Sequence, residues 1–547
     1  MVDKKVRNVL WVVVFFITGV FGLKCLLATE ITFFDEMSYI AIALRFFNGD
    51  AMLVDDWSPM QLNGFLLMPI VGMYYNIFGS MEGIVLFFRI IYILMKLVIA
   101  VFAIYRLWNY GDNKIYTLLG VAFYYFFTPY NIDTLSYNTI PISMIFLISV
   151  IILTHKNNNI ECFFCGIFLA IAVLGHPFIL LGYIACSVML LIYKIRTTSD
   201  NKEYERVWIY VTFGSISVAL IFSLFVFSRA SFSEIMENLT YIIQEPDHDK
   251  GLLEKIWNLV YDIIFDHIFI TITNSVCVVT LFLKEKHVIG RKISIVALIL
   301  SCIYLLSLRD PFIENLIYIP FMWFALEQII YYKNEKKISL VYIIILLSVI
   351  GVYLGTNTRI LSTSAAMSNF ATLSCFIIGR IEKNQKKLRT IEKVQFFVLI
   401  AILILTFILR LFIVWRSWYK IEDFQDYIDK GPLKGMYATE EVWNDYYTVI
   451  DDLDSVDYEE GDVFFCGTYT PLTYLYLNLE YGTMGVAFFF LDYERLDLYW
   501  EMHPEKKPDV LYYLELTYTD EEKEFIEKLY DDYDVKLMED RMIAIRK

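Results

Sequence analysis

The chain has 547 residues, of which 58% are hydrophobic and 17% aromatic, and its mean hydropathy is +0.53. This composition lies far from that of soluble proteins, so it excludes a soluble enzyme with one anchor and indicates a polytopic membrane protein. The formal net charge of −15 argues against a nucleic-acid partner, which requires a basic surface.

Charge is distributed unevenly along the chain. Residues 421–547 contain 32 Asp or Glu against 11 Lys or Arg, whereas the rest of the chain carries a small basic excess. This division predicts a transmembrane domain over residues 1–415 and an acidic extracytoplasmic α/β domain over residues 416–547. The cysteines form no disulfide framework, and no four-ligand metal pattern or Gly-rich phosphate loop is evident in the sequence.

Apolar runs long enough to cross a bilayer recur throughout the first domain. They predict an all-α polytopic membrane protein with about thirteen transmembrane helices. These lie near residues 8–28, 84–105, 115–130, 139–154, 160–175, 178–194, 207–228, 267–283, 293–308, 314–332, 338–355, 361–379 and 394–415. Residues 64–79 are apolar as well, but Pro69 and three glycines make them a poor span, so we expect them to lie beside the membrane.

The basic residues set the expected topology, because Lys and Arg collect in short cytoplasmic loops. With the N-terminus inside, most of them fall in the loops 105–114, 154–159, 193–206, 283–292, 331–337 and 379–393. Counting 64–79 as a span would move every later basic loop to the other side. We therefore expect a multi-pass plasma-membrane protein with a cytoplasmic N-terminus and an extracytoplasmic C-terminal domain.

Polar motifs gather in the loops expected outside. Asp35 and Glu36 follow the first span, ahead of an amphipathic segment suited to the membrane surface. The pair could cap that helix or perform chemistry, since acids suit helix N-termini. We expect Asp55 and Asp56, later in the same loop, to be surface charges.

The later outer loops add one acid and three basic or titratable residues. They carry Asp133 in the second loop, His176 in the third, Arg229 at the start of the fourth and Arg309 in the fifth. His176 could be an interfacial hydrogen-bonding residue and Arg309 a helix-end charge. Together with the acid pair, these residues could also serve an anionic lipid headgroup.

The motifs of the first 330 residues resemble those of GT-C membrane glycosyltransferases of the protein mannosyltransferase and aminoarabinose transferase type. "FFDEMSYIAIA" is similar to the acidic motif of that family's first outer loop, and "PYNIDTLSYN" to its second acidic loop. Arg89 stands where the family has an Arg after its surface helices. His176, in "AIAVLGHPFIL", stands where a Lys is usual, and Tyr318, in "NLIYIPFMWFAL", matches a Tyr of a later segment.

The resemblance implies an inverting glycosyltransferase that takes a sugar from a polyprenyl-phosphate donor and passes it to a glycan, lipid or protein acceptor. The leaving group is an anionic phosphate that needs charge stabilisation, and the acceptor hydroxyl needs a base. We expect Asp35 to be that base, with Glu36 and Asp133 also in the catalytic site. His176 and Arg309 are expected to hold the donor phosphate, with Arg229 in reserve.

Two other classes of protein remain open at this stage. A transporter or flippase of lipid-linked sugars would be expected to show inverted repeats, and none is visible. A non-catalytic envelope-assembly subunit would tolerate the loss of Asp35. No cofactor is certain, and a divalent metal remains an open alternative because carboxylates alone do not specify one.

The acidic domain is expected to be a small α/β unit. Residues 462–467, 485–490 and 509–516 are compact apolar runs typical of buried strands, and residues 520–533 read as a helix. No catalytic constellation is evident there, so we expect this domain to bind the acceptor or shape the entrance to the site.

Overall fold

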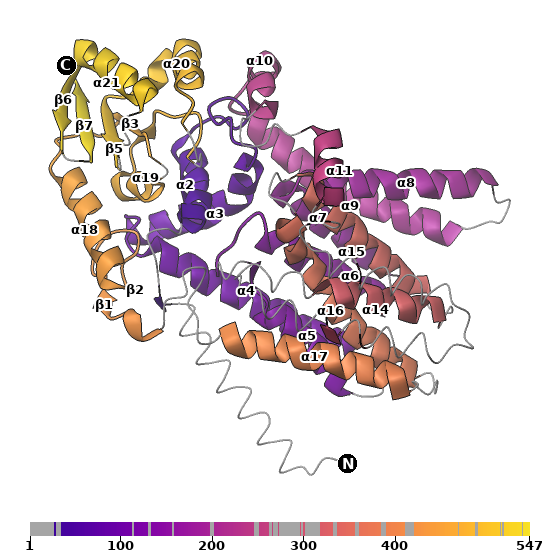
Figure 1. The fold of residues 1–547 in the computed structure, drawn as a ribbon. Coiled ribbons are helices and arrows are strands. Elements are labelled where there is room, and N and C mark those ends of the chain that lie inside the picture. Colours follow the sequence, from indigo (N-terminus) through magenta and orange to yellow (C-terminus); the bar gives the residue numbers. More distant parts are fainter. Residues whose placement is uncertain are drawn as a thin grey trace.

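The structure is a computed structural model, mostly helical, with a small sheet region near the C-terminus (Figure 1). Apart from a few isolated positions between 265 and 300, it describes residues 27–28, 34–111, 114–129, 133–155, 158–196, 202–244, 251–261, 318–331, 336–355, 360–383, 390–410, 421–468, 470–486, 491–514, 516, 519–538 and 540–547.

The described residues between 34 and 410 form a helical bundle. Its elements are α2 (Phe34–Asn48), α3 (Gln61–Phe78), α4 (Ile84–Leu107), α5 (Lys114–Phe126), α6 (Thr139–Thr154), α7 (Asn159–Gly175), α8 (Ile179–Arg196), α9 (Lys202–Phe227), α10 (Phe232–Ile243), α11 (Leu252–Tyr261), α14 (Tyr318–Tyr331), α15 (Lys336–Leu354), α16 (Ile360–Lys383) and α17 (Thr390–Arg410). Almost every residue of α6 is buried, as expected for a helix that is apolar on all faces.

Three helices of the described chain are long and apolar enough to cross a membrane. They are Ile84–Leu107, Glu205–Phe227 and Lys336–Leu354, and they fall on three of the predicted spans. Other predicted spans form shorter apolar helices, among them α6 and α7. The predicted spans 267–283 and 293–308, and almost all of 8–28, lie outside the described residues, so the count of thirteen stays a prediction.

Basic loops that are far apart in the sequence meet at one end of this bundle. Arg106, in the last turn of α4, forms an ion pair of 2.8 Å with Glu161 at the start of α7. Lys337, at the start of α15, donates a hydrogen bond of 2.6 Å to the carbonyl of His155. Three of the loops predicted to be cytoplasmic are therefore neighbours in space.

The amphipathic segment after the acid pair forms α2, which is covered by other elements; its place at the membrane surface stays a prediction. Most side chains of α2 are buried, because α3 packs closely along it. Two glycines of α3 allow this approach: a Cβ at Gly64 would lie 2.7 Å from Ile42, and one at Gly72 would lie 2.8 Å from Phe47.

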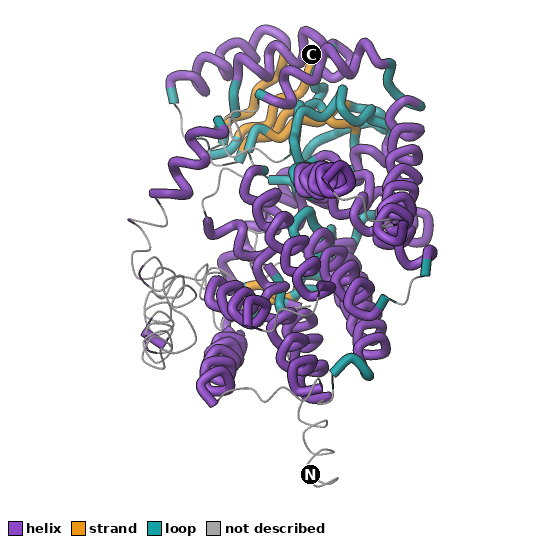
Figure 2. Tube along the Cα trace, turned by 90° about the vertical axis from the view of Figure 1, so that its right-hand side faces the viewer, coloured by secondary structure: helices purple, strands orange, loops and turns teal. Residues whose placement is uncertain are grey.

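The remainder of the chain, residues 421–547, is called the tail here. It contains η5 (Ile421–Asp423), β1 (Asp426–Tyr427), β2 (Tyr437–Ala438), α18 (Glu440–Asp454), β3 (Val463–Cys466), α19 (Leu472–Leu477), β4 (Glu480–Tyr481), α20 (Tyr493–Met502), η6 (Pro504–Lys506), β5 (Val510–Tyr513), α21 (Asp520–Asp532), β6 (Tyr533–Leu537) and β7 (Met542–Arg546). The larger sheet has the order β4-β3-β5-β7-β6, and Figure 2 shows it with helices around it. Strand β3 is parallel to β4 and β5, whereas β7 is antiparallel to β5 and β6.

Three of the elements expected in the tail are confirmed. Strands β3 and β5 lie within the apolar runs 462–467 and 509–516, and α21 occupies the predicted helix. The helix begins with a capping box, in which Thr519 and Glu522 each accept from the other's backbone N–H. Most of the predicted strand 485–490 lies outside the described residues. The C-terminal hairpin of β6 and β7 was not predicted.

Candidate functional site

The acid pair lies in the first turn of α2, and its two members have different environments. The carboxylate of Glu36 is buried and accepts two hydrogen bonds from Arg89 of α4, from Nε at 2.8 Å and from Nη2 at 2.7 Å. This fork-to-carboxylate geometry is the strongest form of such a pair. The third nitrogen of the guanidinium donates to the carbonyl of Ala28 at 2.7 Å. Asp35 is only partly buried.

Arg89 begins a row of polar side chains on one face of α4. Tyr92 and Lys96 follow at spacings of three and four residues, which place them on the same face, and all three side chains are buried. The ammonium of Lys96 donates to the carbonyl of Phe127 at 2.7 Å and to the hydroxyl of Thr128 at 3.2 Å. We call Arg89, Tyr92 and Lys96 the α4 polar row.

Asp133 is held at the far end of this row. The hydroxyl of Thr128 donates to Asp133 Oδ1 at 2.9 Å, and the hydroxyl of Tyr92 lies 3.3 Å from the same Thr128 oxygen. Asp133 is therefore linked to Lys96 through one hydroxyl. The row thus joins Glu36 at one end to Asp133 at the other, which brings the two acidic loops of the sequence to one helix.

Two aromatic contacts connect α2 with His176. Tyr39 lies one helical turn after Asp35 and packs edge-to-face on Tyr137, with ring centroids 5.4 Å apart. Tyr137 makes the same kind of contact with the imidazole of His176, also at 5.4 Å. Successive ring contacts therefore connect α2, which carries the acid pair, with His176, which was predicted to bind the donor phosphate.

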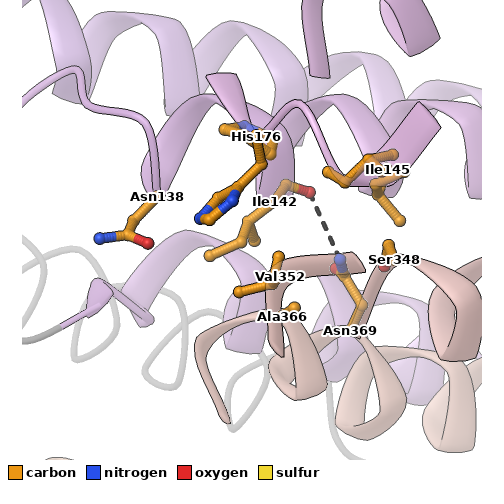
Figure 3. Close-up of a pocket in the computed structure, with 10 residues that line it drawn as sticks. Asn138, Ile142, Ile145, His176, Ser348, Val352, Ala366 and Asn369 are labelled. Atoms are coloured by element: carbon orange, nitrogen blue, oxygen red, sulfur yellow. Dashed lines mark hydrogen bonds between the residues drawn. The ribbon is translucent and has the colours of Figure 1, made fainter. Parts of the chain in front are cut away.

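His176 follows the last residue of α7 and lines a small pocket, shown in Figure 3. Gly175, the last residue of α7, lets this end of the helix lie close to α6, because a Cβ at Gly175 would lie 2.6 Å from Pro141. Asn138 lies on the same side of the pocket, and Asn369 of α16 faces it, donating to the carbonyl of Ile142 at 3.3 Å. The pocket thus combines one imidazole and two amides with apolar walls.

Tyr318, which matches a Tyr of the resembling family, lies beside the loop of Asp133. Tyr318, the first residue of α14, packs edge-to-face on Phe127 at 5.2 Å between centroids. The carbonyl of Phe127 is the one that accepts from Lys96. A segment nearly 200 positions away in the sequence therefore packs beside the loop of Asp133.

Arg229 is not brought to the acid pair. It donates to the backbone carbonyls of Phe46 and Asp50, the latter at 3.0 Å, and its guanidinium lies over the ring of Phe225. These partners lie at the C-terminal end of α2, about 20 Å along the helix from Asp35 at 1.5 Å per residue. Arg309 lies outside the described residues.

Lys96 is the residue that the sequence analysis missed. The signal was available, because a lysine inside an apolar span is costly and usually marks a functional site. The sequence alone does not say which way such a side chain points, and Lys96 was counted only as part of the span.

Asp55 and Asp56 are not surface charges, so that expectation is wrong. Asp56 is fully buried, and the loop that carries it is covered by the tail. Arg45 of α2 lies between the acids, with its Nε 2.5 Å from Asp50 and its Nη1 3.6 Å from Asp56. Burial raises the pKa of the Asp55 carboxyl, and the charge of Asp50 adds to that shift.

The tail supplies the remaining partners of this buried cluster. Lys506 donates to the carboxylate of Asp50 at 2.6 Å. The hydroxyl of Tyr499 donates to the backbone carbonyl of Asp55 at 2.9 Å, and that of Tyr481 to the carbonyl of Ala41 at 3.1 Å. The tail therefore docks on the bundle at the C-terminal end of α2. It also contacts the bundle just before α4, where Lys434 lies 2.7 Å from Glu82 and the N–H of Gly83 donates to the carbonyl of Gly431 at 3.0 Å.

Known proteins give no further assignment: no family model matches this chain, and a search of curated proteins finds no relative.

Proposed function

We propose that this chain is a membrane glycosyltransferase that moves a sugar from a polyprenyl-phosphate donor to an acceptor hydroxyl, with inversion and with Asp35 as the general base. The observation that carries the proposal is the division within the acid pair. Glu36 is buried and matched by Arg89, whereas Asp35 is partly exposed at the adjacent position. A partly exposed carboxylate next to a fixed ion pair is a suitable group to take the proton of a bound hydroxyl.

In the proposed reaction the acceptor oxygen attacks the anomeric carbon from the face opposite the phosphate. The bond between that carbon and the phosphate oxygen breaks, and its electron pair stays on the phosphate. Asp35 takes the hydroxyl proton as the new bond forms, a role worth typically 10²–10⁴-fold in rate. Glu36 acts through Arg89 as a positioning group, because its carboxylate is already occupied.

The proposed phosphate side of the site is supported by the buried cation and donors near Asp133. Lys96 places positive charge inside the bundle, and His176 adds an imidazole beside the pocket of Figure 3. Fixed cationic groups favour an anionic leaving group without needing to reorganise during the reaction. Lys96 reaches the loop of Asp133 through the hydroxyl of Thr128.

The test uses purified protein in liposomes, with a panel of polyprenyl-phosphate sugars as donors and envelope extract as the source of acceptor. Release of polyprenyl phosphate is measured by mass spectrometry. Asp35→Asn should reduce release by 10²–10⁴-fold. The matched control is Glu234→Gln, which changes the first-turn acid of another helix, α10. Transfer by Asp35→Asn within tenfold of the unaltered protein would remove Asp35 from the base role. Undiminished donor translocation without any transfer would favour a flippase.

We also propose that the tail is extracytoplasmic. The tail packs on α2 through Tyr481, and Arg495 donates to the carbonyl of Tyr241 in α10 at 2.6 Å. The first and fourth loops, which are both expected outside, therefore share a side with the tail, and three of the basic loops meet elsewhere. Protease added to intact spheroplasts should cleave the tail. Full protection in sealed cells, with cleavage after lysis, would overturn this topology.

A further inference from the structure

Three side chains with metal-binding atoms converge where the tail meets the first loop. His503 follows α20, Glu505 lies in η6, and Asp55 lies in the loop after α2. The Nδ1 atom of His503 is 3.9 Å from Asp55 Oδ1 and 3.7 Å from Glu505 Oε1. These separations are too long for hydrogen bonds. Within the described part of the chain, Nδ1 makes no hydrogen bond, although the histidine is buried.

The tautomer of the neutral imidazole is set by a hydrogen bond on the other side of the ring. Asn238 Oδ1 accepts from Trp57 Nε1 at 2.8 Å, and Asn238 Nδ2 donates to the carbonyl of Glu234 at 3.0 Å. The amide oxygen therefore faces His503 Nε2 at 3.2 Å, and Nε2 must be the donor. The neutral ring then carries its lone pair on Nδ1, directed toward the two carboxylates. An amide carbonyl that orients the second nitrogen in this way is typical of metal-bound histidines.

Among the described residues, the nearby cations Arg45 and Lys506 bind directly to other oxygens, not to the side-chain oxygens of Asp55 and Glu505. Arg45 binds Asp50 and the backbone carbonyl of Asp55, and Lys506 binds Asp50 at 2.6 Å. The side chain of Asp55 is anchored by its other oxygen, which accepts from the N–H of Ala51 at 2.5 Å. Its Oδ1 is left facing His503.

We propose that Asp55, His503 and Glu505 bind a divalent transition-metal ion of the Zn²⁺ type. One imidazole nitrogen and two carboxylate oxygens form a ligand set that suits zinc, with ligands about 2.0–2.2 Å from the ion. Atoms that bind the same zinc ion lie closer to one another than Asp55 Oδ1, His503 Nδ1 and Glu505 Oε1 do here. Small rotations of these side chains would bring the three atoms to the ion. The imidazole disfavours Ca²⁺ and Mg²⁺, which take oxygen ligands. Glu505 is exposed and leaves the remaining coordination to solvent.

The ion would join two parts of the molecule that are 450 positions apart. Asp55 belongs to the loop after α2, whereas His503 and Glu505 belong to the tail. Zinc therefore acts as a clamp that holds the tail on the bundle. This inference does not depend on glycosyl transfer, because Asp35 lies at the opposite end of α2.

The test uses the full chain in detergent with a Strep-type tag, since a polyhistidine tag would itself bind zinc. After chelation, re-addition of ZnCl₂ and desalting, elemental analysis should find one zinc per chain. Added Co²⁺ should give visible absorption bands, and Ca²⁺ should not compete. His503→Gln keeps a side-chain donor for Asn238 but removes the imidazole Nδ1 and its lone pair. It should therefore lower zinc affinity at least tenfold and abolish the cobalt bands.

Glu505→Gln provides a second variant in case His503→Gln does not fold, because Glu505 is on the surface and its change leaves the buried contacts in place. It should also lower zinc affinity. The matched control is Glu501→Gln, an exposed acid at the end of α20, which should bind zinc as the unaltered chain does. The proposal would be overturned if the unaltered chain held no stoichiometric zinc. It would also be overturned if His503→Gln and Glu505→Gln both bound zinc as tightly as the unaltered chain.

Discussion

The two ends of α2 both bury charged groups, yet they differ in how those charges are matched. At the C-terminal end, Arg45 and Lys506 surround Asp50, and further tail residues close over the cluster. At the N-terminal end, Arg89 matches Glu36, while the adjacent Asp35 stays partly exposed. A buried charge without a partner is very costly. Buried charges are therefore matched at both ends. Cover by the tail distinguishes the docking end, and the partly exposed Asp35 beside a matched pair distinguishes the end proposed for chemistry.

The comparison also shows why burial by itself does not identify a catalytic acid. Asp56 is more deeply buried than Asp35, but it lies beside Arg45 in a junction covered by the tail. For a general base the relevant features are access for the acceptor and a fixed charge environment. Asp55, after the C-terminal end of α2, is partly exposed like Asp35, but Tyr499 and His503 of the tail lie against its loop. We therefore propose that the acceptor reaches the N-terminal end.

The largest effect is expected from breaking the ion pair at that end. Glu36→Gln leaves the guanidinium of Arg89 buried without its counter-charge, which costs about 3–5 kcal/mol. The variant should therefore unfold in detergent at a clearly lower temperature, as measured by intrinsic fluorescence. Replacing both residues by Met should recover most of the loss, because it leaves no uncompensated charge. A Glu36→Gln protein as stable as the unaltered chain would show that the pair is not buried as described.

The sequence predicted the class of fold because long apolar runs and strand-like runs are local signals. Helices α6, α7 and α15 and strands β3 and β5 all fall on such runs. It also placed Asp35, Asp133 and His176 in separate loops that the structure connects through side-chain contacts.

The errors at the C-terminal end of α2 have a physical cause. The charges of Asp55 and Asp56 are compensated by Arg45 in the same segment and enclosed by Lys506 and His503 of the tail. Contacts between residues more than 400 positions apart leave no local pattern in the sequence. Two adjacent acids are therefore interpreted as exposed surface residues. The burial of α2 was missed because it depends on packing against α3 and against the tail, which the pattern of α2 itself does not reveal.

A smaller effect is expected at the docking end. Lys506→Met removes a hydrogen bond to a charged group, worth about 1.5–3 kcal/mol, but Asp50 keeps Arg45 as a partner. The tail should loosen without the bundle unfolding. Hydrogen exchange should therefore increase over residues 500–510 and stay unchanged over α6. The exposed pair of Lys507 with Asp532 offers the control, because Lys507→Met should have little effect. Equal exchange in both variants would count against docking through Lys506.

The smallest effect is expected from Arg229, and it decides between two roles for that side chain. Arg229 was predicted as a reserve ligand for the donor phosphate, but it binds the carbonyls of Phe46 and Asp50 at the negative end of the α2 dipole. Arg229→Met should therefore cost about 1 kcal/mol of stability and change the apparent affinity for a polyprenyl-phosphate sugar less than threefold. His176→Ala, at the pocket connected to the acid-pair end, should weaken donor binding more. Titration of donor-dependent phosphate release in both variants checks the order. A tenfold loss of donor affinity in Arg229→Met would place phosphate at the docking end and break the distinction between the two ends of α2.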